Sequence, residues 1–201
     1  GSVKDKTGML HYEDIETTMK NAQDFCVVNC PCSMYRVDTG LCKKPLEICM
    51  QFTAGAVRHA VENAVGRKIT KEEALKIQHY AAEQGLVATV FGGEKLGLVC
   101  NCCGDCCSNI AVQIKSGYPL VEKSRYQSLI DQELCNRCQE CVDRCWFGAI
   151  SMVKAPGSKR MTAQVDVKKC HGCGLCVVKC PVEGAASLKI VRPREHIPMY
   201  E

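Results

Sequence analysis

The chain has 201 residues, a formal net charge of +4 and only 5% aromatic residues. This mild charge forms no basic stripe interleaved with aromatic side chains, which argues against nucleic-acid binding. No apolar stretch approaches the roughly 20 residues of a membrane-spanning helix. The start of the chain also lacks a charged segment followed by an apolar one, so we expect a cytoplasmic protein without a membrane span.

Cysteine is the unusual part of the composition, with 18 residues in three blocks at 26–49, 100–107 and 135–180. Adjacent pairs, such as Cys102-Cys103 and Cys106-Cys107, rarely bridge to each other, whereas short arcs of thiolates suit metal coordination. We therefore expect metal binding in a reducing compartment instead of a disulfide scaffold.

The stretch between the first two blocks is predicted to be helical. Apolar residues recur at spacings of three and four in residues 54–65, and Thr70 with Glu73 forms a capping box before a second helix that ends at Gly85. Residues 86–91 then read as extended. We expect these two helices to form a hairpin that brings the second cysteine block beside the first.

These signals divide the chain into an N-terminal extension (1–25), a mainly helical Cys-rich domain (26–114), a polar linker (115–131), an eight-cysteine domain (132–192) and an extended tail (193–201). Gly117 and Pro119 mark the linker, and Pro193 and Pro198 mark the tail. Gly1-Ser2 resembles a cloning scar, so we also expect that the native polypeptide is longer.

The third block contains one pattern twice. The copies are Cys135-x2-Cys138-x2-Cys141-x3-Cys145 and Cys170-x2-Cys173-x2-Cys176-x3-Cys180, the second followed by Pro181. Three cysteines at two-residue gaps wrap three corners of a cubane cluster, while the fourth, one helical turn later, reaches the neighbouring cluster. The pattern therefore predicts two [4Fe–4S] clusters, one held by Cys135, Cys138, Cys141 and Cys180 and the other by Cys170, Cys173, Cys176 and Cys145.

The surroundings of these motifs fit an α+β fold of short strands and helices with pseudo-twofold symmetry. Gly172 and Gly174 flank Cys173, where the loop must turn tightly, and apolar strands are predicted at residues 149–153 and 186–190. A pair of zinc sites is the alternative, because zinc also takes four thiolates, but two full runs with crossing ligands favour iron–sulfur clusters.

With all eight ligand positions filled, residues 135–180 resemble the bacterial dicluster ferredoxin family. Trp146 departs from that family, which usually has proline at this position. We expect its ring to shield the second cluster, to dock a partner or only to pack in the core. His171 lies inside the second motif, and we expect it either to tune the neighbouring cluster or to be a solvated loop residue.

The front half resembles a group of iron–sulfur proteins of anaerobes that join a Cys-rich N-terminal region to a dicluster ferredoxin end. The similar residues include Cys30-Pro31-Cys32, Cys42-x2-Pro45-x-Glu47-x-Cys49, residues 69–75, Gly85-Leu86-Val87 and Cys100-Asn101-Cys102-Cys103-Gly104-Asp105-Cys106-Cys107. The resemblance implies additional iron–sulfur binding in this half but no particular ligand assignment.

The spacing of the N-terminal cysteines favours metal sites shared between the first two blocks. The cysteines of the first block are too far apart to wrap a cubane cluster by themselves, and those of the second are too crowded for all five to bind one metal. The expected ligands, for one or two iron–sulfur centres, are Cys32, Cys42, Cys49, Cys100, Cys102, Cys103, Cys106 and Cys107. Cys26 and Cys30 are the expected spectators. A structural zinc site, a non-cubane cluster and a reactive thiol beside a cluster are the alternatives.

The leading functional hypothesis is an electron carrier that relays low-potential single electrons between a redox donor and an acceptor enzyme, or within a larger fused reductase. The second is an electron-input subunit, or an enzyme with the N-terminal centre as its reaction site. The third is a zinc-stapled docking module joined to a redox-active end. We assign no catalytic residue, because the five histidines do not cluster and no nucleotide-binding loop is present.

Overall fold

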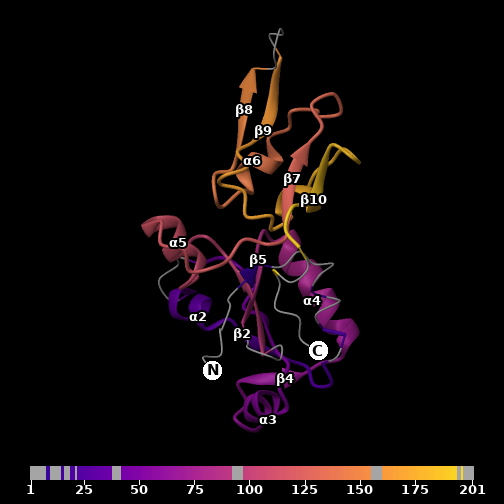
Figure 1. The fold of residues 1–201 in the computed structure, drawn as a ribbon. Coiled ribbons are helices and arrows are strands. Elements are labelled where there is room, and N and C mark those ends of the chain that lie inside the picture. Colours follow the sequence, from indigo (N-terminus) through magenta and orange to yellow (C-terminus); the bar gives the residue numbers. More distant parts are fainter. Residues whose placement is uncertain are drawn as a thin grey trace.

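The computed structural model describes residues 8–9, 15, 19–20, 22–37, 42–91, 97–154, 160–193 and 196. A six-stranded sheet with its helices lies at one end of the molecule, and the elements of the eight-cysteine domain lie at the other (Figure 1). Most of the expected N-terminal extension and of the tail falls outside the described residues. Within the described part, no helix is long and apolar enough to cross a membrane.

The N-terminal sheet has the strand order β1-β5-β6-β3-β2-β4, and all of its neighbouring strands are antiparallel. In chain order the elements are β1 (Gly8–Met9), β2 (Cys26–Asn29), α2 (Pro31–Val37), β3 (Glu47–Gln51), α3 (Ala54–Glu62), β4 (Gly66–Lys68), α4 (Lys71–Glu83), β5 (Val87–Phe91), β6 (Leu98–Cys102) and α5 (Ile110–Ser116).

The prediction of a mainly helical N-terminal domain is therefore wrong. Cys26 lies in β2, Cys49 in β3, and Cys100 and Cys102 in β6. Inside a strand, a buried cysteine behaves as a small apolar residue. The sequence interpretation treated Cys49, Cys100 and Cys102 only as ligands and Cys26 as a spectator. It therefore missed the short strands that these cysteines complete with neighbouring apolar residues.

The two predicted helices exist, but they do not form a simple hairpin. Thr53 caps α3 and Thr70 caps α4, each accepting a hydrogen bond from a backbone N–H three residues later. Strand β4 separates the two helices; α3 packs on β2 and β4, whereas α4 contacts β3, β5 and β6. The predicted extended segment at 86–91 corresponds to β5.

Side-chain alternation gives the sheet two different faces. Val27, Met50, Val90 and Val99 are fully buried in one apolar cluster, which also contains Ala74 of α4. Burial of each such side chain stabilises the fold by about 1.5–3 kcal/mol. The strand cysteines are the immediate neighbours of these residues in sequence, so they project from the opposite face. That arrangement gathers thiols from three strands on one surface of the sheet.

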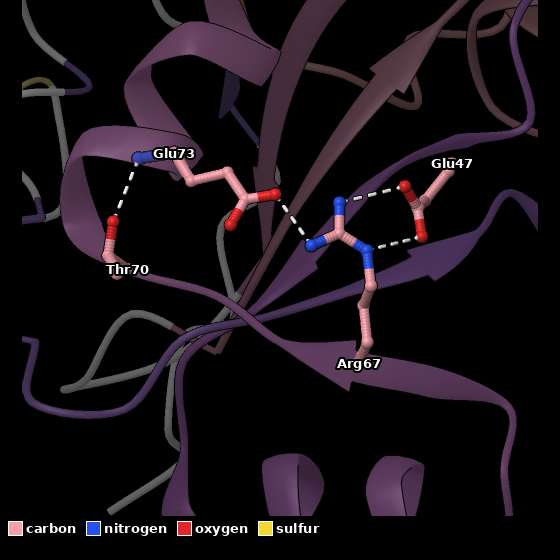
Figure 2. A network of polar contacts seen from close by, with 4 residues as sticks. All are labelled: Glu47, Arg67, Thr70 and Glu73. Atoms are coloured by element: carbon pink, nitrogen blue, oxygen red, sulfur yellow. Dashed lines mark hydrogen bonds and ion pairs between the residues drawn. The ribbon is translucent and has the colours of Figure 1, made fainter.

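The edge strand β4 is held to the rest of the domain by Arg67 (Figure 2). Its guanidinium donates two hydrogen bonds to the carboxylate of Glu47, at 2.8 and 2.9 Å, and one to Glu73 at 2.5 Å. Glu73 also donates its backbone N–H to the Thr70 hydroxyl at the start of α4. Arg67 lowers the pKa of Glu47 below its usual range, because it stabilises the ionised carboxylate.

The eight-cysteine domain contains two two-stranded antiparallel sheets and two short helices. Its elements are β7 (Tyr126–Ile130), α6 (Glu140–Asp143), β8 (Ile150–Lys154), β9 (Met161–Val165), α7 (Leu175–Val178) and β10 (Ala186–Ile190). β7 pairs with β10, and β8 with β9. Strand β7 lies within the segment expected as a linker. The polar composition of this segment suggested an exposed linker, but its Ser128 is buried beside Cys176.

We expect Arg67→Ala to lower the midpoint of thermal unfolding by about 1–3 °C, because it removes a bidentate ion pair and a second carboxylate contact. The difference should shrink at high salt, which screens exposed charges. Lys68→Ala is the matched control, since the contact of Lys68 with Asp24 is longer, at 3.8 Å. Equal shifts in the two variants, measured by circular dichroism under anaerobic conditions, would contradict this role of Arg67.

Candidate metal centres

The two cysteine runs have the same unusual backbone shape. In the second run Gly172 and Gly174 have φ values of 71° and 82°. At the matching positions of the first run, Arg137 and Gln139 have φ values of 67° and 69°, although neither is glycine. A non-glycine residue in this left-handed region costs about 1–2 kcal/mol. The loop that wraps around the middle cysteine therefore imposes the same conformation with or without glycine.

Each run lines one cavity with three cysteines and contributes the fourth to the other cavity. One cavity is lined by what we call the outer thiol set: Cys135, Cys138, Cys141 and Cys180. The other is lined by the inner thiol set: Cys145, Cys170, Cys173 and Cys176. Apolar side chains such as Ile130 and Ala163, or Ile150 and Leu175, complete the walls.

These thiols fit a bound metal cluster in number, donor type and surroundings. Burial raises the pKa of Cys141 to about 11, and it also raises the pKa of Cys173 and Cys176. Without a metal such thiols stay protonated at neutral pH. A bound cluster supplies the positive charge that stabilises thiolates here, and it would occupy the space between the four sulfur atoms.

Comparison with known families agrees with this geometry. Residues 134–184 match the family model described as a 4Fe-4S dicluster domain. These residues form a dicluster ferredoxin domain. The match supports 4Fe-4S clusters and electron transfer as the chemistry of the domain. A comparison with curated proteins found no match.

Hydrogen bonds reach the inner thiol set of the ferredoxin domain from several sides. Ser128 places its hydroxyl 3.1 Å from the sulfur of Cys176 and its backbone N–H 3.5 Å from that of Cys170. The backbone N–H of Ala149 lies 3.3 Å from the sulfur of Cys145. Such donors stabilise negative charge on sulfur. Nothing in the cysteine spacing identified Ser128, which acts from β7.

His171 lies against the inner thiol set and is a packed residue. Its ring stacks on Phe147, with centroids 3.9 Å apart. The carbonyl of Lys169, 2.8 Å from Nδ1, can only accept, so Nδ1 carries the proton and Nε2 accepts from the side-chain amide of Gln113 at 2.9 Å. Burial lowers the pKa of His171, which favours the neutral ring. The residue thus links the ferredoxin domain to α5.

Trp146 joins the ferredoxin domain to the N-terminal domain. Its ring N–H donates to the carbonyl of Gly85 at 2.7 Å, just beyond α4. The ring also lies so close to Gly104, in the second cysteine block, that any Cβ there would overlap it. Arg144 donates to the carbonyls of Ala82 and Glu83 at 2.6 and 3.1 Å. The residues on either side of Cys145 thus dock on the end of α4.

A thiol triad in the N-terminal domain combines the first two cysteine blocks. Cys42, Cys103 and Cys106 place their sulfur atoms within 4.8 Å of one another, close enough to bind one metal ion. Cys106 lies 2.7 Å from Cys103 and 3.3 Å from Cys42, sulfur to sulfur, and Ser33 contacts both Cys42 and Cys106. Cys32 lies beside the second block, 3.4 Å from the hydroxyl of Ser108.

The other expected N-terminal ligands lie in a separate group, which we call the thiol row. It consists of Cys30, Cys49, Cys100, Cys102 and Cys107 and so includes one expected spectator. Hydrogen bonds with the side chains of Cys100 and Cys30 lower the pKa of Cys49. Cys26 differs from these residues, because it has no thiol partner among the described residues.

Gly172 provides a test of the loop around the inner thiol set. At φ 71°, any Cβ here would overlap the carbonyl oxygen of Tyr126 and the hydroxyl of Ser124. We expect Gly172→Ala to lose about four iron atoms per chain, because the loop can no longer place Cys170 and Cys173 around one cluster.

Gly117→Ala is the matched control for this substitution. Gly117 has a φ of 72°, but open space surrounds its Cβ position. This variant should keep its iron and lose only about 1 kcal/mol of stability from backbone strain. Equal iron content in the two variants, measured after anaerobic purification, would show that the close packing at Gly172 is not needed for the cluster.

Proposed function

We propose that this protein relays low-potential single electrons through two [4Fe–4S] clusters, one bound by the outer and one by the inner thiol set. The thiol triad extends this path as a further centre, and a redox enzyme takes up or supplies the electrons. The observation that carries the proposal is the pair of cavities, each lined by four cysteines, three from one run and one from the other.

The position of each thiol set supports a path with one end at the surface. Cys138 of the outer set is exposed, and nearby Leu134 is half exposed. Such a surface suits the docking of an electron donor or acceptor. The inner set faces the N-terminal domain, because Leu175 packs in one buried cluster with Ala82 and Val87.

The residues of the chain hold, insulate and tune the clusters, which supply the redox chemistry when bound. The apolar walls exclude water from the inner set, while Ser128 and the backbone N–H of Ala149 donate toward its sulfur atoms. Trp146 fixes the distance between Cys145 and the triad by packing on Gly104. Each of these groups affects the energy or the geometry of electron transfer, and none of them forms or breaks a covalent bond.

Anaerobic iron, sulfide and zinc analysis of the intact chain, combined with EPR of the reduced protein, tests the proposal. We expect about eight iron atoms from the ferredoxin domain and at least four more from the N-terminal domain. Magnetic coupling between the two reduced clusters should appear in the EPR spectrum, because they are neighbours. About eight iron atoms together with zinc would instead favour a zinc-stapled docking module, and absence of iron from the ferredoxin domain would refute the relay.

A second candidate is an enzyme, or its electron-input subunit, with the triad as the reaction site. It is favoured by the number of thiols in the triad, since three ligands leave a fourth position open for water or a substrate. A change in the EPR signal of the N-terminal centre on adding cyanide would support this candidate. A spectrum that cyanide leaves unchanged would favour the simple relay.

Ser128 allows a test of tuning. Because its hydroxyl stabilises negative charge on the sulfur of Cys176, Ser128→Ala should lower the midpoint potential of the inner cluster. A hydrogen bond worth about 0.5–1.5 kcal/mol corresponds to roughly 20–60 mV for one electron. Ser151→Ala, at an exposed position of β8, is the control. An EPR-monitored redox titration showing equal potentials in both variants would argue against tuning by Ser128.

A further inference from the structure

The thiol row is assembled by the register of the N-terminal sheet. Cys100 and Cys102 lie two residues apart on β6 and therefore share one face. Val99 pairs with Met50 of β3, which places Cys49 opposite Cys100 on that face. Thr89 of β5 pairs with Cys100 and holds its hydroxyl 3.4 Å from the sulfur of Cys102. Three cysteines from two neighbouring strands thus lie side by side.

Contacts between side chains extend this group at both ends. Side-chain interactions run from Cys30 to Cys49, from Cys49 to Cys100, from Cys100 to Cys102 and from Cys102 to Cys107. Four of the five residues are buried, and Cys100 is partly buried. Among the described residues, no hydrogen bond directly joins a thiol of the row to a thiol of the triad. Cys30 and Cys49 do share a buried cluster with the triad, and Ser33 contacts Cys30 as well as two thiols of the triad. The thiol-to-thiol contacts nevertheless divide these cysteines into two groups of sulfur donors.

Cys26 shows what an ordinary core cysteine looks like in the same sheet. It is fully buried, and among the described residues its sulfur bonds to the backbone of Gln51 and to no other thiol. A buried cysteine without a thiol partner behaves as a small apolar residue of the core. The thiols of the row instead contact one another, an arrangement that suits shared ligation of a soft metal.

We propose that the thiol row binds its own [4Fe–4S] cluster, separate from the metal of the triad. The ligands are Cys49, Cys100, Cys102 and one of the two end cysteines, Cys30 or Cys107. This inference rests on the proposed relay, and it places two centres in the N-terminal domain.

The surroundings of the row favour iron–sulfur chemistry. Cys102 and Cys107 belong to a buried cluster that Cys173 of the inner thiol set packs against. The row therefore adjoins the second cluster of the ferredoxin domain, on the side where Leu175 enters the same buried cluster. All of its donors are thiols, the ligand type that holds such clusters in the neighbouring domain.

Iron counts in single and double variants test whether the two groups are separate. Cys100→Ala should remove about four iron atoms, and Cys103→Ala should remove only the metal of the triad. The double variant should lose the sum of the two. If the row and the triad held one shared centre, the double variant would lose no more than either single variant, and the proposal would be overturned.

Cys26→Ala is the matched control, and it should keep all of its iron, because this cysteine belongs to neither group. Should Cys100→Ala fail to fold, Cys49→Ala removes a ligand from the neighbouring strand and should show the same loss. Among the end variants, either Cys30→Ala or Cys107→Ala should lose this iron. Retention in both, or zinc in place of iron at the row, would overturn the proposal.

The EPR signals of the ferredoxin domain separate this inference from the relay itself. They should persist in every N-terminal variant, because the outer and inner thiol sets are untouched. If the wild-type chain lacks those signals, the relay is refuted whatever the row binds. If they are present while the N-terminal iron losses are not additive, only the separate centre is refuted.

Discussion

The contact between the two halves of the molecule depends on the last turn of α4. The final carbonyl groups of a helix have no partners within the helix, and positive charge nearby is favourable. Arg144 and Trp146 of the ferredoxin domain supply hydrogen-bond donors to this end, and Lys44 of the N-terminal domain donates to Gln84. Since Cys145 lies between Arg144 and Trp146, one short segment both positions a predicted cluster ligand and joins the two domains.

This joint explains why a tryptophan follows Cys145 where dicluster ferredoxins usually have proline. Proline has no N–H to donate to Gly85 and no flat ring to cover Gly104. Glycine at 104 is the complementary requirement, because any side chain there would overlap the indole. Cys103 and Cys106 flank this contact, so the packing that holds the domains together also brings the triad close to the ferredoxin domain.

The ferredoxin domain could be predicted from local spacing, whereas the N-terminal domain could not. Two-residue gaps between cysteines dictate a wrapped loop, and the cavities are lined by the thiols that this geometry predicts. The N-terminal groups instead depend on strand register, which sets Cys49 opposite Cys100 across a long separation in sequence. Spacing alone therefore gave no sign that Cys30 contacts Cys49, and no sign of Ser128 or Arg144.

The two halves also differ in what stabilises them. The N-terminal sheet buries a continuous apolar face, including Val27, Met50 and Val99. The ferredoxin domain has short four-residue helices and a small buried group around Ile150 and Ala163, and its first loop places Arg137 and Gln139 in a strained conformation. Metal–thiolate bonds must therefore supply much of its folding free energy, because ligand binding to the native state stabilises that state. The N-terminal sheet, which needs no metal for its apolar core, then provides the scaffold on which the ferredoxin domain docks through Arg144 and Trp146.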